Sequence, residues 1–216
     1  MTSPRSPLRI AIVGYGTAGQ AAALLFTRDG HHVEVFERTA VLGPVGAGFL
    51  LQPTGLAVLW ELGLLDHALA HGARIGRLFG ESTAGRAVMD MRYRELHPHF
   101  FGLGMQRGAL FGLLDDAWRV ARHVHCGRRI VEVDAARRVL RDEHGVEHGA
   151  FDVVIVADGG ASALRGAGVD DLQHPLLLGG VELGLVERAV DHADAGVQDP
   201  PAAVDEDALV GRAAPG

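Results

Sequence analysis

Three glycines near the N-terminus and one acidic residue after them have the types and spacing needed to bind a dinucleotide. The apolar, β-branched run 10–13 predicts a buried strand, and Gly14 directly after it permits a tight turn. Gly16 has no Cβ to keep a diphosphate away from the backbone, and Gly19 lets the following helix pack closely on the strand. The first N–H groups of that helix, at its positive dipole end, would then bind the diphosphate.

The acidic residue is Glu37, at the end of a second predicted strand over 33–37. It follows Gly19 by eighteen residues, the distance at which a carboxylate can accept hydrogen bonds from both hydroxyls of an adenosine ribose. Arg38 comes next and could contact a phosphate on that ribose, although an exposed arginine is the commoner case. Strand, turn, helix, strand and acid together predict an adenine dinucleotide site.

A second glycine turn follows another buried strand, over 151–157. There the carboxylate of Asp158 can accept a ribose or ribityl hydroxyl, and Gly159 lets a cofactor pass close to the backbone. Ser162 can cap the next helix, and Arg165 can supply charge to a diphosphate. Taken alone, Asp158 and Gly159 also fit an ordinary strand-to-helix turn. Together with the first glycine turn they favour a flavin site over simple nicotinamide binding.

Composition limits the classes of partner. A formal net charge of −7 gives no basic surface for nucleic acid, and no stretch is long and apolar enough to suggest a membrane span. The single cysteine, Cys126, excludes an internal disulfide and suits a reducing cytoplasm. Oligomeric state cannot be read from these features.

Histidine pairs are the nearest approach to a metal site. His123 and His125 are alternate residues of one predicted strand and so share a face, and His97 and His99 have the same spacing. No third ligand is evident near either pair in the sequence, so we expect no metal site.

The order of elements predicts an α/β fold. Helices are expected over 53–62, 64–70 and 108–121. We expect β structure over 73–106 and short strands at 123–126, 129–134 and 137–142. The strands at 9–13, 33–37 and 152–157 are expected to lie side by side and parallel. We therefore expect a Rossmann-like domain over 1–165 with an added β-hairpin region. Residues 166–216 lack a clear period, and 191–216 hold six acids and one arginine, so a weakly structured tail is expected there.

With these motifs in this order, residues 8–165 resemble the FAD-dependent aromatic monooxygenases related to p-hydroxybenzoate hydroxylase. The resemblance implies that Gly14, Gly16, Gly19 and Glu37 bind the adenosine part of FAD. It further implies that the loop ending at Gly48 and the run Gln52–Leu56 lie beside the flavin, and that Arg107 contacts the diphosphate or ribityl region. The run 157–165 would serve both FAD and NAD(P)H. Such enzymes reduce FAD with NAD(P)H and transfer one oxygen atom to a small aromatic or polyketide-like substrate.

The sequence also departs from that family. The family's third motif, a Gly-Asp pair that holds the ribityl chain, is missing, because no Gly-Asp dipeptide occurs anywhere in these 216 residues. No residue can therefore be named as catalytic, and the chain is expected to be an incomplete FAD-binding domain, truncated at its C-terminus. Two alternatives stay open: a truncated or frame-shifted remnant without activity, and a nicotinamide-only reductase, against which Asp158 and Gly159 argue.

Overall fold

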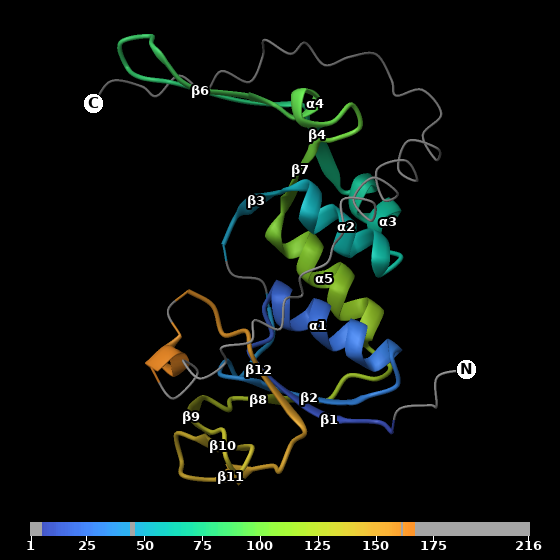
Figure 1. Cartoon of the computed structure of the whole chain (residues 1–216), viewed down its shortest axis with the longest axis vertical. Helices are drawn as coiled ribbons and strands as arrows, with labels where there is room; N and C mark the ends of the chain where they lie inside the picture. The colour runs from blue at the N-terminus through green and yellow to red at the C-terminus, as the bar shows by residue number, and fades with distance from the viewer. Residues whose placement is uncertain (1–5, 44–45, 161, 167–216) are drawn as a thin grey trace.

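A four-stranded parallel sheet lies in the lower part of the view in Figure 1, below two helices. The computed structural model describes residues 6–43, 46–160 and 162–166. Strand order in the sheet is β12-β1-β2-β8, comprising β12 (Val153–Val156), β1 (Arg9–Val13), β2 (His32–Glu37) and β8 (Val124–Cys126). The predicted parallel neighbours near 9–13, 33–37 and 152–157 are thus confirmed, with Ile10 paired to both Val153 and Val33.

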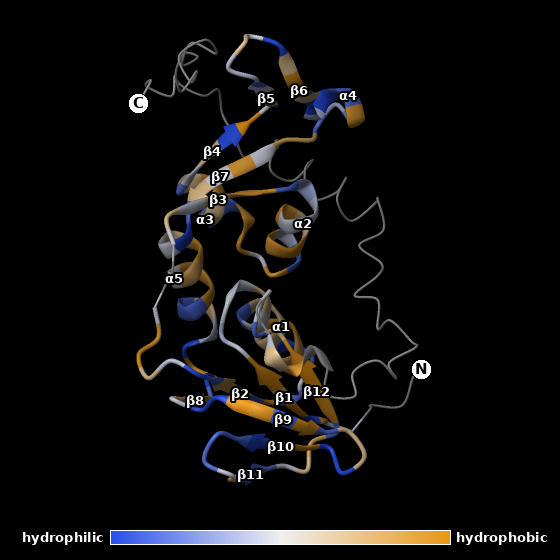
Figure 2. Cartoon of the chain, turned by 90° about the vertical axis from the view of Figure 1, so that its left-hand side faces the viewer, coloured by the Kyte–Doolittle hydropathy of each residue, from blue (hydrophilic) through white to orange (hydrophobic). Residues whose placement is uncertain are grey.

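Helices α1 (Thr17–Arg28) and α5 (Arg107–Trp118) cover one face of this sheet. Ile10 and Ile12 are fully buried against this layer, and Ala23, also fully buried, keeps α1 close to the strands. Figure 2 shows β1, β2 and β12 as an apolar band beneath α1. Their buried, β-branched residues explain why these short runs form strands.

The other face of the parallel sheet is covered by a small antiparallel sheet of β9 (Ile130–Asp134), β10 (Val139–Asp142) and β11 (Glu147–His148). Phe36, Leu140 and Phe151 form the apolar contact between the two sheets. This is the added β-hairpin region that the sequence predicts. The strand predicted over 123–126, by contrast, joins the parallel sheet as its edge, beside β2.

A second layer lies beyond α1 and α5, as both views show (Figures 1 and 2). It holds an antiparallel sheet in the order β3-β7-β4 and the two helices that pack on it. These elements are β3 (Gly48–Leu51), β7 (Gly102–Gln106), β4 (Gly72–Ile75), α2 (Pro53–Glu61) and α3 (Leu65–Ala70). Their core includes Leu56, Leu103 and Leu110, so the start of α5 belongs to this layer too.

A two-stranded hairpin of β5 (Arg77–Glu81) and β6 (Ala87–Arg92) extends from this layer. It is followed by the short helix α4 (Tyr93–Leu96), which the sequence does not predict because four residues are too few for a visible period. Tyr93 anchors α4, since its buried hydroxyl donates to Gln52 Oε1 at 2.7 Å.

The described residues end with η1 (Ala163–Gly166), a short 3₁₀ helix. The tail predicted over 166–216 lies outside the described residues except for Gly166. Among the helices that are described, none has the length and apolar character required to cross a membrane.

Candidate dinucleotide site at the carboxyl edge of the parallel sheet

The first glycine turn is built by contacts that leave no room for a side chain. Gly14 has a φ of +101°, and its N–H donates to the carbonyl of Phe36 at 2.8 Å. A Cβ on Gly14 would stand 2.6 Å from the carbonyl oxygen of Ala157, and one on Gly19 would overlap the carbonyl oxygen of Gly14. Glycine is required at both positions because the ends of β1, β2 and β12 meet here.

Gly16 differs from its two neighbours. It is the residue that precedes α1, it makes no side-chain cap, and a Cβ built on it would meet nothing within 4 Å. The space over the first turn of α1 is therefore open, and no capping side chain occupies its N–H groups. The N-terminus of this twelve-residue helix is open and is therefore suited to an anion such as a diphosphate.

Glu37 is held at the same edge by three donors. Its Oε2 accepts from the N–H of Tyr15 at 2.8 Å, and its Oε1 accepts from the N–H and the hydroxyl of Thr39, both at 2.9 Å. The carboxylate is partly buried, whereas Arg38 beside it is exposed. Because Oε2 has a single donor in this set, it can accept a further hydrogen bond from a ligand hydroxyl.

The second glycine turn reaches the same edge. The Cα of Asp158 lies 2.8 Å from the position of a Cβ on Gly14, and Gly159 has a φ of +92°. Oδ1 of Asp158 is buried and has no hydrogen-bond partner among the described residues. A buried carboxylate oxygen without a donor is rare, and a hydroxyl group of a bound cofactor would satisfy it.

Ser162 caps the short helix that follows, as predicted, because its hydroxyl accepts from the N–H of Leu164 at 3.1 Å. The side chain of Arg165 lies outside what is described.

Helices α1 and α5 run parallel with their N-termini side by side. Gln20 Nε2 donates to the carbonyl of Phe111, and Trp118 Nε1 donates to the hydroxyl of Thr27. Within each pair the two residues are 91 positions apart in the sequence. The same offset sets Arg107, the first residue of α5, opposite Gly16. Two positive helix ends and an exposed guanidinium therefore face the space over the glycine turn.

Arg107 also contacts the loop before β3. Its N–H donates to the carbonyl of Ala47 at 3.0 Å, its guanidinium lies 5.6 Å from the ring centre of Phe49, and a Cβ on Gly46 would meet its Nε at 3.4 Å. Gly48 is exposed and lies directly across from Gln106 in the sheet. The predicted residues Gly48 and Arg107 are thus neighbours.

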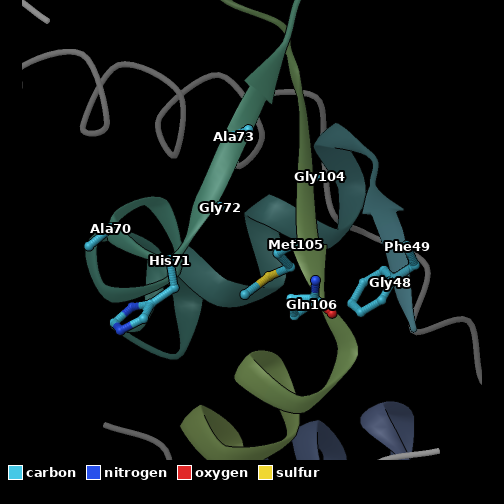
Figure 3. Close-up of a pocket in the computed structure, with 9 residues that line it drawn as sticks. All are labelled: Gly48, Phe49, Ala70, His71, Gly72, Ala73, Gly104, Met105 and Gln106. Atoms are coloured by element: carbon cyan, nitrogen blue, oxygen red, sulfur yellow. The ribbon is translucent and has the colours of Figure 1, made fainter. Parts of the chain in front are cut away.

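Beyond Arg107, the β3-β7-β4 sheet carries a hollow of about 560 Å³ (Figure 3). Phe49, His71, Met105 and Gln106 line it together with five small residues, which are glycine or alanine. Gly48, His71, Ala73 and Gln106 are exposed, so the described residues leave the hollow open to solvent.

Two residues at this edge have roles that sequence reasoning missed. Tyr15, inside the glycine turn, is only 2% exposed, and its ring packs against Phe111 and Trp118. Its hydroxyl donates to Asp115 Oδ1 at 2.7 Å. Gln20 is fully buried, and its Oε1 has no partner among the described residues. Only the pairing of α1 with α5, which is not visible in the sequence, could have indicated either role.

Burial raises the pKa of Tyr15 well above its usual range, and the bond to Asp115 adds to this shift. Partial burial would raise the pKa of Asp115, but hydrogen bonds from Tyr15 and Arg122 outweigh that effect and lower it. At neutral pH the pair is therefore a neutral phenol that donates to a carboxylate, which fixes the glycine turn to α5.

One of the two histidine pairs has a neighbour that the sequence does not reveal. The sequence gives no third ligand beside His123 and His125, but the fold brings Glu34 to them, with Oε2 at 3.0 Å from His125 Nε2. Glu34 lies 89 residues before His123, which is why spacing along the chain does not reveal the group.

Comparison with known proteins gives a consistent result. The family described as "FAD binding domain" matches residues 8–172. A 3-amino-4-hydroxybenzoate 2-monooxygenase from Streptomyces cremeus is 36% identical over 195 residues, which cover 85% of this chain and 47% of that protein. A 3-hydroxybenzoate 6-hydroxylase from Polaromonas naphthalenivorans is 27% identical over 184 residues, covering 79% and 44%. The chain thus spans about half the length of the curated relatives it matches.

Solved structures agree on the fold. A variant of 2-methyl-3-hydroxypyridine-5-carboxylic acid oxygenase superposes with a TM-score of 0.64 and 25% identity over 74% of this chain and 42% of that one. HpxO of Klebsiella pneumoniae, solved with FAD and uric acid, has a TM-score of 0.58 at 21% identity over 73% of this chain and 41% of that one, and shows the fold alone.

Proposed function

The chain belongs to the FAD binding domain family of the FAD-dependent aromatic monooxygenases, and on that premise we propose that the carboxyl edge of its parallel sheet binds FAD for an NAD(P)H-dependent hydroxylation. The convergence of two glycine turns carries this proposal. Asp158 approaches Gly14 so closely that one dinucleotide can contact both turns at once. Ligands of doubly wound sheets bind outside the carboxyl ends of the strands, which is where both turns lie.

We assign the adenosine half of FAD to the first turn. Gly14, Gly16 and Gly19 shape the backbone over which the diphosphate lies, with the N–H groups of α1 as donors. Glu37, positioned by Tyr15 and Thr39, accepts from the ribose hydroxyls, and the exposed Arg38 borders that end. The open space at Gly16 and the free acceptor capacity of Glu37 support this orientation.

We assign the other half to the second turn and the start of α5. The unpartnered Oδ1 of Asp158 accepts from a ribose or ribityl hydroxyl, beside Gly159. Arg107 supplies charge to the diphosphate, and Gly48 lets the cofactor pass toward the hollow on the β3-β7-β4 sheet. When bound, FAD supplies the redox chemistry, while this chain binds and orients it.

The substrate class follows from the relatives. Two of the relatives are named for hydroxybenzoate substrates. We infer a small aromatic or polyketide-like substrate for the protein to which this domain belongs, NAD(P)H as its reductant, and the cytoplasm as its location. We also propose residues 1–165 as the FAD-binding domain and 166–216 as a separate tail.

An FAD titration with two arginine variants tests the site. Arg107→Ala should weaken FAD binding by about 1.5–3 kcal/mol, the value of a charge-assisted hydrogen bond. Arg119→Ala, at the other end of the same helix, is the matched control and should leave the dissociation constant unchanged. Equal affinities of both variants and the wild type would remove Arg107 from the site.

A further inference from the structure

Three potential metal ligands meet on a different part of the parallel sheet. Glu34 comes from β2, His123 directly precedes β8, and His125 lies in the middle of β8. Oε2 of Glu34 lies 3.0 Å from His125 Nε2, and the ligand atoms of all three side chains lie within 4.8 Å of one another. The two imidazole rings have centroids 4.7 Å apart.

The strand pairing fixes this arrangement. Val35 N–H donates to the carbonyl of His123, and Phe36 lies directly across from His125. Alternate residues of a strand share a face, so Glu34 and the two histidines project from the same side of the sheet. The ring of Phe36 stacks on His125 with centroids 4.7 Å apart and planes 14° apart, which holds the imidazole in place.

Charge and access favour a cation at this point. Oε1 of Glu34 is 3.4 Å from the guanidinium of Arg9, which leaves Oε2 directed at the histidines. Glu34 and His125 are partly buried, and His123 is exposed. Because His123 is exposed, water can reach the three ligand groups from that side.

We propose that Glu34, His123 and His125 bind a divalent transition-metal ion of the Zn²⁺ class. Two imidazoles and one carboxylate, with an open position for water, are a ligand set for such ions, whereas Mg²⁺ and Ca²⁺ prefer oxygen alone. Ligand atoms around tetrahedral Zn²⁺ lie about 3.4 Å apart, from bond lengths near 2.1 Å. Glu34 Oε2 and His125 Nε2, at 3.0 Å, need to move apart by only a few tenths of an ångström, and the exposed His123 can approach them by rotation.

This site is separate from the dinucleotide edge. Glu34 precedes Glu37 by three residues, or about 10 Å along a strand, and its side chain is on the face away from α1. A bound metal would tie the edge strand β8 to β2.

A zinc titration of the full chain, purified without a histidine tag and stripped of metal, tests this proposal. Calorimetry should give one Zn²⁺ per chain, and one equivalent should raise the melting temperature. Glu34→Gln, His123→Ala and His125→Ala should each weaken Zn²⁺ binding at least about tenfold, since even residues that merely orient a ligand are worth 10–100-fold in affinity.

The double variant His97→Ala/His99→Ala is the matched control. It removes a histidine pair of the same spacing beside which no third ligand group lies among the described residues, and its Zn²⁺ affinity should equal that of the wild type. Circular dichroism and thermal unfolding would verify that each variant is folded, and Co²⁺ absorption would report the coordination geometry. No Zn²⁺ uptake by the wild type, or equal affinity in folded His123→Ala/His125→Ala, would overturn the proposal.

Discussion

Glu37 is the residue on which the proposed contact with an adenosine ribose depends. Glu37→Ala should weaken binding of both FAD and ADP by about 1–3 kcal/mol, because charge-assisted hydrogen bonds to the ribose are lost. Glu95→Ala, an exposed glutamate on α4, is the control and should bind both ligands as the wild type does. Isothermal titration with each ligand measures the difference. Unchanged affinity in Glu37→Ala would mean that the carboxylate serves the glycine turn alone.

Gly16 and Gly19 should respond to alanine in opposite ways. In Gly16→Ala the new methyl group meets no protein atom, so the melting temperature should change little while FAD binding weakens. In Gly19→Ala the methyl group would overlap the carbonyl of Gly14, so the fold itself should lose stability. Thermal unfolding and FAD titration of both variants separate these effects. A strongly destabilised Gly16→Ala would contradict the open space seen above α1.

The antiparallel sheet β9-β10-β11 is the element whose stability should depend most on acid pH. Buried Asp142 accepts from the N–H groups of His144 and Val146, and its Oδ2 is 3.1 Å from His148 Nε2. Burial would raise the pKa of Asp142, but these hydrogen bonds lower it. Arg137 and Arg141 lower the pKa of exposed Glu147 from 4.5 to about 2.

When folding lowers the pKa of a carboxyl group, that group stabilises the fold at pH values above its unfolded-state pKa. This stabilisation is lost as the pH falls through the folded-state pKa. The sheet should therefore lose stability between about pH 4.5 and 2. Amide hydrogen exchange of β10 and β11 over this range measures the loss. Glu147→Gln should reduce the pH dependence at low salt and have a smaller effect at high salt, because its ion pairs are exposed. An unaltered exchange profile in that variant would assign the effect to Asp142.

Local signals explain which elements could be predicted. The apolar run 10–13 ends at Gly14, the strand at 33–37 is rich in β-branched residues, and Pro53 and Arg107 begin helices with clear apolar spacing. Residues near one another in sequence therefore suffice to predict these elements. The pairing of β8 with β2, the burial of Tyr15 and the approach of Glu34 to His125 involve residues far apart in the chain. No local pattern in the sequence reveals these contacts, so they could not be predicted.

The whole chain should bind FAD without carrying out productive hydroxylation. The hollow beyond Arg107 is open among the described residues, and the sequence has no Gly-Asp pair to hold the ribityl chain. A flavin exposed to water is expected to reduce oxygen without transferring it to a substrate. The 216-residue chain should therefore oxidise NAD(P)H at most without coupled product. Oxygen uptake and product analysis with hydroxybenzoates measure this, and stoichiometric hydroxylated product would contradict it.

Whether the carboxyl edge binds FAD can be decided by an equilibrium titration of the wild-type chain, followed by flavin fluorescence, with ADP as competitor. If the two glycine turns hold one dinucleotide, one FAD should bind per chain, and ADP should displace it competitively because it occupies the Gly14–Glu37 half of the same site. Failure of the folded chain to bind FAD, or FAD that stays bound at saturating ADP, would contradict this assignment.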